Sequence, residues 1–334
     1  MNILFRCDGS VEIGLGHVVR CLTLADHLKE NHDCNIHFSM RKSELGINKV
    51  KKSYPVIEAN EQAFDYEDWL SDCIYKSNAD ILVMDMRDGL LKQELKQIKK
   101  KTVVKVVTID DPEDKRLEAD LAFYPPVPQL NNMSWEGFNG KIFSGWEYVI
   151  LRKEFSKYYP KPNISIPNIL ISMGAADNRN MTKFAIYALN EINEKFKTII
   201  IVGSGYLQLE ELKSTLNSVS FKFELHQNPD NIAEIMSQSN FAVISFGQTA
   251  YEFAALKIPA IYLCLTDDHF ESSKLFMNEG IGTSLGVYSE EKKQDLVEAV
   301  LFHIKEKHAI KSIFDSLNLL NISNLEKISS IILG

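Results

Sequence analysis

The sequence predicts an α/β protein made of two halves, each a parallel sheet covered by helices. Three observations predict this class. The chain has 334 residues, enough for two domains of roughly 150 residues each. Short apolar runs alternate with turns and amphipathic helices, which is typical of strands buried on both faces. This pattern pauses at residues 152–168, which hold three of the ten prolines, and then starts again.

The first half is predicted over residues 1–151 and begins with a strand at 2–6. A helix is predicted over about 17–30, because its apolar residues recur at helical period and form one buried stripe. The members of this stripe are Val18, Cys21, Leu22, Ala25 and Leu28. Further strands are predicted at 36–40, 81–85, 103–110 and 121–124. We interpret residues 152–168 as a linker.

The second half is predicted over residues 169–334. Its predicted strands are 169–173, 198–202, 221–225, 241–245 and 258–265. Its predicted helices are 179–194, 230–238, 249–257 and 270–279, with a helical tail from 290. Ligands of such sheets bind at the carboxyl ends of the strands, so we expect the site in the cleft between the two halves.

Composition excludes several classes of protein. The 37 basic and 45 acidic residues give a net charge of −8, which argues against nucleic acid as the main partner. The basic stretch 92–105 fits the solvated face of a helix that runs into a strand. No apolar run reaches the roughly 18 residues of a membrane helix, and residues 1–6 are too short for a signal-peptide core. We therefore expect a cytoplasmic protein without stable membrane insertion.

Motifs for metals and common cofactors are missing. The five scattered cysteines form no C-x-x-C pair, so neither disulfides nor a zinc knuckle are indicated. Position 19 is Val19, where a dinucleotide fingerprint would need its third glycine, and there is no P-loop. The common signatures of serine, zinc and cysteine hydrolases are also missing. We expect no cofactor and no metal.

The loop after the first predicted strand is the first candidate site. Gly14 and Gly16 allow close backbone approach and open a helix whose free N–H groups could hold an anion. His17 lies in the first turn, where the helix dipole disfavours the imidazolium, so we expect a neutral ring that can act as a general base. Asp8 could orient this ring or bind a sugar hydroxyl, and Arg20 could hold a phosphate. The alternative is that His17 only caps its helix and Asp8 only satisfies loop amides.

Two loops of the second half form a second candidate group. Residues 173–177 follow a predicted strand and are expected to open a helix suited to a phosphate, and residues 245–249 repeat this arrangement. The candidate substrate-binding residues on these loops are Gly174, Ala175, Gly247, Gln248 and Thr249. Glu252, one helical turn further, suits a ribose diol. The alternative is an ordinary carboxylate that the helix dipole favours.

Acidic residues end several other predicted strands. Asp85 and the pair Asp110-Asp111 are expected to rim the cleft, or equally to cap loop amides. Asp267, Asp268 and His269 follow a strand of the second half, and three adjacent side chains on one loop cannot all face one ion. With so many strand-end acids, no carboxylate pair for glycoside hydrolysis can be identified.

Three segments of the chain resemble one known family. The first is Arg6-x-Asp8-x-Ser10 with Ile13-Gly14-x-Gly16-His17-Val18-x-Arg20-Cys21-Leu22-x-Leu24-Ala25. The others are Gly145-x-x-Tyr148-x-x-Leu151-Arg152-x-Glu154-Phe155 and Met173-Gly174-Ala175-Ala176-Asp177. Over roughly 280 residues the chain resembles the PseG-like hydrolases of pseudaminic acid biosynthesis. These enzymes release 2,4-diacetamido-2,4,6-trideoxy-β-L-altrose from UDP.

The resemblance implies a GT-B fold, in which two Rossmann-like domains face each other across a cleft. It implies that UDP lies mainly on the C-terminal half and that the family's catalytic histidine corresponds to His17, with Asp8 beside it. The implied reaction is metal-independent attack of water on the anomeric carbon, with C–O cleavage and inversion. The further residues that we expect to bind the substrate are Arg6, Ser10, Gly14, Gly16, Arg20, Asp85, Asp268 and His269.

Departures from the family leave the sugar open. Asp85-Met86-Arg87 stands where the family has an Asp-His-Tyr set, which alters the sugar-facing half. Asp268-His269 stands where an Asn-Gln pair is frequent, which alters the nucleotide-facing half. Ala175-Ala176 replaces the usual Gly-Gly pair.

Three functions remain open. The leading prediction is hydrolysis of a UDP-activated diacetamido-trideoxyhexose with His17 as the base. The second is glycosyl transfer from a UDP- or CMP-sugar in surface polysaccharide synthesis, with an acceptor hydroxyl in place of water. The third is a nucleotide-sugar-binding protein without activity. In each case the partner is a small-molecule nucleotide-sugar, and a monomer is favoured.

Overall fold

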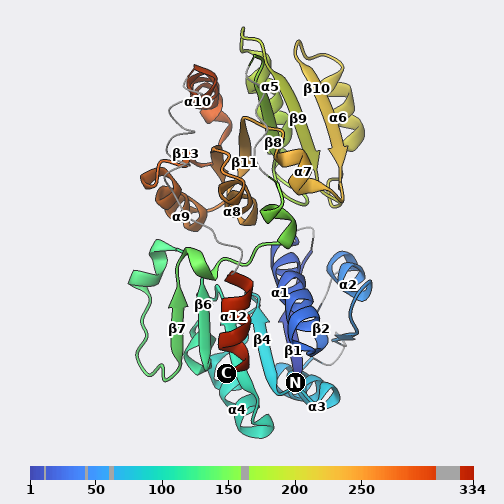
Figure 1. Cartoon of the computed structure of the whole chain (residues 1–334), viewed down its shortest axis with the longest axis vertical. Helices are drawn as coiled ribbons and strands as arrows, with labels where there is room; N and C mark the ends of the chain where they lie inside the picture. Colours follow the sequence, from blue (N-terminus) through green and yellow to red (C-terminus); the bar gives the residue numbers. More distant parts are fainter. Residues whose placement is uncertain (11–12, 42–43, 60–63, 159–164, 306–323) are drawn as a thin grey trace. The chain divides into compact units, whose positions relative to one another are not determined.

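The computed structural model describes residues 1–10, 13–41, 44–59, 64–158, 165–305 and 324–334 (Figure 1). The chain divides into two compact units. Unit 1 comprises Met1–Arg152 and Asn321–Gly334, and unit 2 comprises Lys153–Leu320. Each unit has its own parallel sheet with helices, as the sequence predicts.

The end of the chain departs from the prediction of a second half that runs to residue 334. Helix α12 (Asn324–Leu333) packs on unit 1, against α1 (Gly16–His32) and the short helix η3 (Trp146–Tyr148). The reason is its apolar stripe, because Leu325, Ile328 and Ile332 are buried there. Residues 306–323 of the predicted helical tail and 159–164 of the predicted linker lie outside the described residues.

The sheet of unit 1 has the order β3-β2-β1-β4-β5-β6-β7, and every pair of neighbours is parallel. Its strands are β1 (Asn2–Cys7), β2 (Asn35–Met40), β3 (Val56–Glu58), β4 (Ile81–Asp85), β5 (Lys105–Ile109), β6 (Leu121–Tyr124) and β7 (Lys141–Ser144). The longer helices besides α1 and α12 are α2 (Glu44–Lys51), α3 (Tyr66–Ser77) and α4 (Lys92–Thr102). The predicted solvated helix at 92–105 is α4, which buries only Leu95 and Ile98 and runs toward β5.

The order of the strands makes a topological switch point between β1 and β4. From β1 the chain continues to β2 and β3 on one side, and then crosses to β4 on the other side of β1. The loops that follow β1 and β4 therefore diverge, and open parallel sheets bind their ligands at such switch points. Cys7, the last residue of β1, lies beside Asp85, the last residue of β4.

Unit 2 repeats this plan with the strand order β10-β9-β8-β11-β12-β13. Its strands are β8 (Asn168–Ser172), β9 (Lys197–Val202), β10 (Lys222–Gln227), β11 (Phe241–Ser245), β12 (Ala260–Cys264) and β13 (Gly282–Val287). Its helices are α5 (Met181–Asn190), α6 (Leu209–Leu216), α7 (Ile232–Met236), α8 (Gln248–Ala255), α9 (Asp267–Asn278) and α10 (Lys293–Lys305). The switch point of this sheet lies between β8 and β11.

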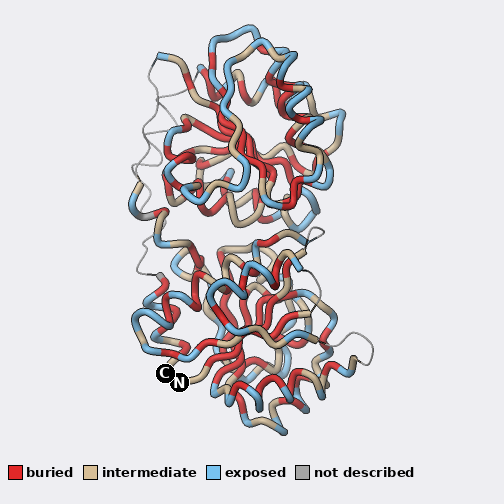
Figure 2. The backbone as a smooth tube through the Cα atoms, turned by 90° about the vertical axis from the view of Figure 1, so that its right-hand side faces the viewer, coloured by how far each residue is buried: buried red, intermediate tan, exposed pale blue. Residues whose placement is uncertain are grey.

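The central strands form the core of each unit, whereas the edge strands β7 and β10 are largely exposed. Figure 2 shows that the buried segments gather in the middle of each unit, with exposed segments around them. Both faces of β4 and β11 are fully covered, which explains their continuous apolar sequences. All five cysteines are free and buried. Among the described residues, no helix combines the length and the apolar character needed to cross a bilayer.

Candidate functional site

Asp85 is at the centre of the switch point of unit 1. Its side chain is fully buried, and its Oδ1 lies 2.6 Å from Nδ1 of His17, in the first turn of α1. Arg20, one turn further along α1, donates from Nε to Asp85 Oδ2 at 2.7 Å and from Nη2 to Oδ1 at 2.6 Å. One carboxylate therefore fixes the orientation of both side chains. We call His17, Arg20 and Asp85 the His17 group.

The charges of the His17 group stabilise one another. Burial by itself would raise the pKa of Asp85, but Arg20 and His17 outweigh burial and hold this pKa well below its ordinary value. Arg20 also donates from Nη1 to Oδ2 of Asp110, just after β5, at 3.3 Å. The Asp85 side chain is thus a carboxylate throughout the physiological pH range.

This arrangement suits proton transfer at the outer nitrogen of His17. An ionised carboxylate next to Nδ1 favours the tautomer with the proton on Nδ1, which leaves a lone pair on Nε2. The His17 side chain is 23% exposed, whereas that of Asp85 is fully buried. A histidine held in this way can take a proton from a water or a hydroxyl group.

The structure changes the predicted roles of Asp8 and Arg6. Asp85, and not Asp8, orients the imidazole of His17. Asp8 accepts instead from Nη2 of Arg6 at 2.6 Å and from the backbone N–H of Arg41 at 2.7 Å. Arg6 is fully buried, so the predicted contact of its side chain with a substrate is wrong.

The predicted role of Arg20 as a phosphate ligand also changes. Its guanidinium is held by the carboxylates of Asp85 and Asp110, and its side chain is 12% exposed. Arg20 therefore neutralises buried carboxylates and positions Asp85 beside His17.

Arg6 belongs to a buried ion-pair cluster that the sequence did not reveal. It contacts Asp88 at 2.7 Å and Tyr66 at 2.8 Å in addition to Asp8, and Tyr66 also donates to Asp88. Asp88 follows the end of β4 by three residues, so the strand-end rule could have found it. No sequence signal marked Tyr66, because α3 carries no motif.

The described residues of the loop between β1 and α1 are hydrogen-bonded to one another. The backbone N–H of Ser10 donates to the carbonyl of Gly14 at 3.2 Å, and Ser10 Oγ accepts from the N–H of Ile13. Gly14 has a φ of 76°, which favours glycine. Gly16 begins α1 with open space where a Cβ would be, and no described side chain caps this helix. The first-turn N–H groups of α1 therefore have no described side-chain acceptor, and binding of an anion at Gly14 and Gly16 stays a prediction.

Several predicted nucleotide residues meet at the switch point of unit 2. Gly174, with a φ of 83°, follows β8, and a Cβ there would lie 3.7 Å from Oγ of Ser245. The loops after β8 and β11 are therefore neighbours. Gly247 precedes α8, which begins with Gln248 and Thr249, and no described side chain caps it. Glu252 lies one turn inside and is buried.

The expected helix start at residues 173–177 is wrong. Helix α5 begins only at Met181, and Gly174 and Ala175 lie in the preceding turn. Asp177 accepts from the backbone N–H groups of Met181 and Thr182, both at 2.8 Å. The Asp177 carboxylate thus accepts from the helix N-terminal N–H groups that the sequence predicted would bind a phosphate.

Asp268 and His269 lie in the first turn of α9 rather than on a loop. Thr266 caps this helix by accepting from the N–H of His269 at 3.2 Å. The His269 ring lies 6.1 Å from the ring of Phe246, which follows β11. The loops after β8, β11 and β12 therefore contribute to one edge of the unit 2 sheet.

Comparison with curated proteins gives three relatives. The chain is 29% identical over 275 residues to the uncharacterized protein MJ1062 of Methanocaldococcus jannaschii, covering 79% of this chain and only 55% of that protein. It is 25% identical to the UDP-2,4-diacetamido-2,4,6-trideoxy-beta-L-altropyranose hydrolase of Campylobacter jejuni, covering 84% of this chain and 97% of that enzyme. It is 24% identical to the spore coat polysaccharide biosynthesis protein SpsG of Bacillus subtilis, covering 86% of this chain and 84% of that protein. The predicted resemblance to PseG-like hydrolases is confirmed.

Solved structures establish the fold. MurG of Acinetobacter baumannii superposes with a TM-score of 0.72 at 12% identity, covering 99% of both chains. The UDP-GlcNAc 2-epimerase of Neisseria meningitidis bound to UDP-GlcNAc gives a TM-score of 0.66 at 13% identity, covering 100% of this chain and 99% of that chain. The predicted GT-B fold is therefore confirmed. No protein-family model matches the chain.

Proposed function

We propose that this protein is an enzyme that hydrolyses a UDP-activated diacetamido-trideoxyhexose to the free sugar and UDP, in the biosynthesis of a nonulosonic acid such as pseudaminic acid. The observation that carries this proposal is the His17 group, in which a buried carboxylate orients a partly exposed histidine. The similarity to the Campylobacter jejuni hydrolase extends over 84% of the chain and supports the same substrate class. The enzyme would act in the cytoplasm as a monomer.

In the proposed reaction Nε2 of His17 removes a proton from a water molecule as its oxygen bonds to C1 of the sugar. The bond between C1 and the diphosphate oxygen breaks at the same time, and UDP leaves with the bonding electron pair. Attack from the face opposite the leaving group inverts the configuration at C1. The imidazolium that forms is stabilised by Asp85, which in turn is held by Arg20.

Unit 2 would bind the nucleotide in this proposal. The N-terminus of α8 offers backbone N–H groups to the diphosphate, and Glu252 would accept from the ribose hydroxyls. The turn at Gly174 and Ala175 follows β8, and Asp268 and His269 follow β12; these two strands lie on either side of β11 in the same sheet. No step in this mechanism uses a metal ion.

The test is incubation of the protein with a panel of UDP- and CMP-sugars in ¹⁸O-water, without any acceptor. We expect release of free sugar that carries the label, because C–O cleavage places the water oxygen on C1. His17→Ala should abolish release, whereas His226→Ala, on β10 of unit 2, should leave it unchanged. Label in UDP, or equal turnover in His17→Ala, would contradict the mechanism.

Glycosyl transfer is the second candidate. Arg87 is exposed just after β4, where the hydrolase family has a tyrosine, and a cationic side chain there could bind an acidic acceptor. The similarity to a polysaccharide biosynthesis protein of Bacillus subtilis points the same way. Donor turnover that requires an added acceptor glycan would establish transfer. Binding of UDP in calorimetry without turnover under either condition would instead identify a binding protein.

A further inference from the structure

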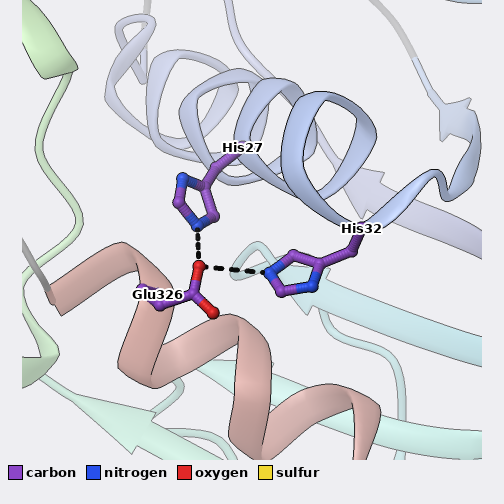
Figure 3. Close-up of side chains that lie close together, drawn as sticks. All are labelled: His27, His32 and Glu326. Carbon is purple, nitrogen blue, oxygen red and sulfur yellow. Dashed lines mark hydrogen bonds and ion pairs between the residues drawn. The ribbon is translucent and has the colours of Figure 1, made fainter.

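A second cluster of histidine and carboxylate side chains lies at the opposite end of α1 from His17. His27 and His32 come from the last turns of α1, and Glu326 comes from α12. Figure 3 shows both imidazole rings directed at the same carboxylate oxygen. Nε2 of His27 lies 3.1 Å from Glu326 Oε2, and Nε2 of His32 lies 3.3 Å from it. The proposed hydrolysis does not use any of these groups.

The spacing of the three groups matches that of metal ligands. Each residue offers one ligand atom, and these atoms all lie within 4.8 Å of one another. In a tetrahedral site with metal bonds of about 2.0–2.1 Å, neighbouring ligand atoms are about 3.4 Å apart. The two nitrogen-to-oxygen distances of 3.1 and 3.3 Å are close to this value. The two imidazole nitrogens, which lie within 4.8 Å of each other, would have to approach for one ion to bond all three groups.

The surroundings of the cluster also suit a cation. Oε2 of Glu326 faces Nε2 of both imidazole rings. The other oxygen of Glu326 accepts from Ser330 Oγ at 3.2 Å, which helps to hold the carboxylate in place. The Glu326 side chain is 53% exposed, so water can supply the remaining ligand. The amide nitrogen of Asn31 lies 3.2 Å from Nδ1 of His27 and donates to the backbone carbonyl of His27 at 2.9 Å, which helps to hold the ring in place.

We propose that His27, His32 and Glu326 bind one divalent transition-metal ion, which ties α12 to α1. Two imidazoles and one carboxylate favour zinc, cobalt, nickel or copper over magnesium or calcium, because the last two prefer oxygen ligands alone. The ion would have a structural role. Residues 321–334 are the part of unit 1 that follows unit 2 in the chain, so an ion here would hold the two parts of unit 1 together.

The test uses the full-length, untagged protein, stripped with a chelator and then titrated with Zn²⁺. All three tryptophans, Trp69, Trp135 and Trp146, lie in unit 1, so their fluorescence reports the melting of this unit alone. We expect one equivalent of Zn²⁺ to raise this Tm, and Mg²⁺ to leave it unchanged. Co²⁺ should give visible absorption bands that saturate at the same stoichiometry.

Two variants show whether these residues are the ligands. His32→Gln and Glu326→Gln should each weaken Zn²⁺ binding by roughly tenfold or more, since loss of an outer-shell partner alone costs about 10–100-fold. His226→Gln, which removes a histidine of unit 2 outside the cluster, should bind as the parent protein does. Absence of saturable binding at one equivalent, or unchanged binding in both variants, would overturn the proposal and leave the cluster an ion pair only. Loss of this metal should not change hydrolysis below the Tm, which separates the two proposals.

Discussion

Asp85 determines what His17 can do, because one buried carboxylate contacts both His17 and Arg20. Placing three charged or ionisable groups together away from water lowers the stability of the folded protein unless each group has a partner. Here the guanidinium contacts both oxygens of Asp85, and the imidazole shares one of them. The carboxylate therefore stays ionised, and the imidazole keeps one orientation and one tautomer.

Replacing Asp85 with asparagine tests this role. In Asp85→Asn the amide retains the size of the side chain but no longer favours the proton on Nδ1. We expect kcat for the proposed hydrolysis to fall by about 10²–10⁴-fold, with a smaller change in KM. Steady-state kinetics with the active donor measure this effect, and circular dichroism checks the fold. Asp72→Asn, on the exposed side of α3, should retain full activity. Equal kcat in both variants would refute the role of Asp85.

A second buried carboxyl group, that of Asp111, is expected to make the free energy of unfolding of unit 1 depend on pH. Asp111 is 2% exposed, and burial raises its pKa to about 6, although Lys115 lies 3.4 Å from Oδ1. The native state thus binds a proton more tightly than the unfolded state, whose carboxyl has a pKa of about 3.9. The contribution of Asp111 to the free energy of unfolding is therefore greatest below about pH 4 and falls as the pH rises to about 6.

We expect this effect to reach about 3 kcal/mol between about pH 4 and pH 7. Urea unfolding followed by tryptophan fluorescence measures it, because all tryptophans lie in unit 1. The comparison is made between Asp111→Asn, which should lose this part of the pH dependence, and Asp114→Asn, whose carboxylate is 81% exposed. The same pH dependence in both variants would show that Asp111 titrates normally.

Among the elements, α5 and α8 both follow a switch-point strand of unit 2, yet their N-termini differ. In the turn that precedes α5, Asp177 and Asn180 adopt positive φ angles of 47° and 56°. Because these angles are not helical, α5 begins only at Met181. This delay allows the Asp177 carboxylate to accept from the first two amides of α5. Helix α8 begins directly after Gly247 without a described side-chain cap. Of these two helices, α8 is therefore the one that can receive a phosphate.

Asp177→Ala should destabilise unit 2 by about 1–2 kcal/mol, because two helical N–H groups lose their acceptor. Unit 2 has no tryptophan, so its melting is the calorimetric transition that occurs without a change in tryptophan fluorescence. The matched control is Glu194→Ala, an exposed residue in the connection between α5 and β9. An equal shift in both variants would mean that the cap contributes nothing.

The sequence predicts most elements of the fold but only part of the site. Strands such as β4 and β11 are recognisable because both faces are buried and every residue is apolar or ends the strand. Asp85, rather than Asp8, contacts His17 because β4 lies next to β1 in the sheet. The spacing of residues along the chain does not predict this order of strands. In the same way, the apolar stripe of α12 predicts a helix but not the unit on which it packs.

For the whole molecule, the main consequence is that unit 1 is built from two parts of the chain. Ile328→Ala on α12 should lower the free energy of unfolding of unit 1 by about 2–5 kcal/mol, since it removes a fully buried side chain. Tryptophan fluorescence should report this loss, and the melting of unit 2 should stay unchanged. Ile331→Ala, at a partly exposed position of the same helix, should cost less. A loss in unit 2 instead would contradict the assignment of α12 to unit 1.

The position of α12 also affects the order in which the protein can form during synthesis. Residues 153–320 leave the ribosome before residues 321–334, so all of unit 2 is available while unit 1 still lacks α12. Domains usually fold in the order of their synthesis. Here unit 2 can complete its folding before unit 1. Until α12 is synthesised, the apolar surface of unit 1 that α12 covers stays exposed and can bind chaperones or other nascent chains.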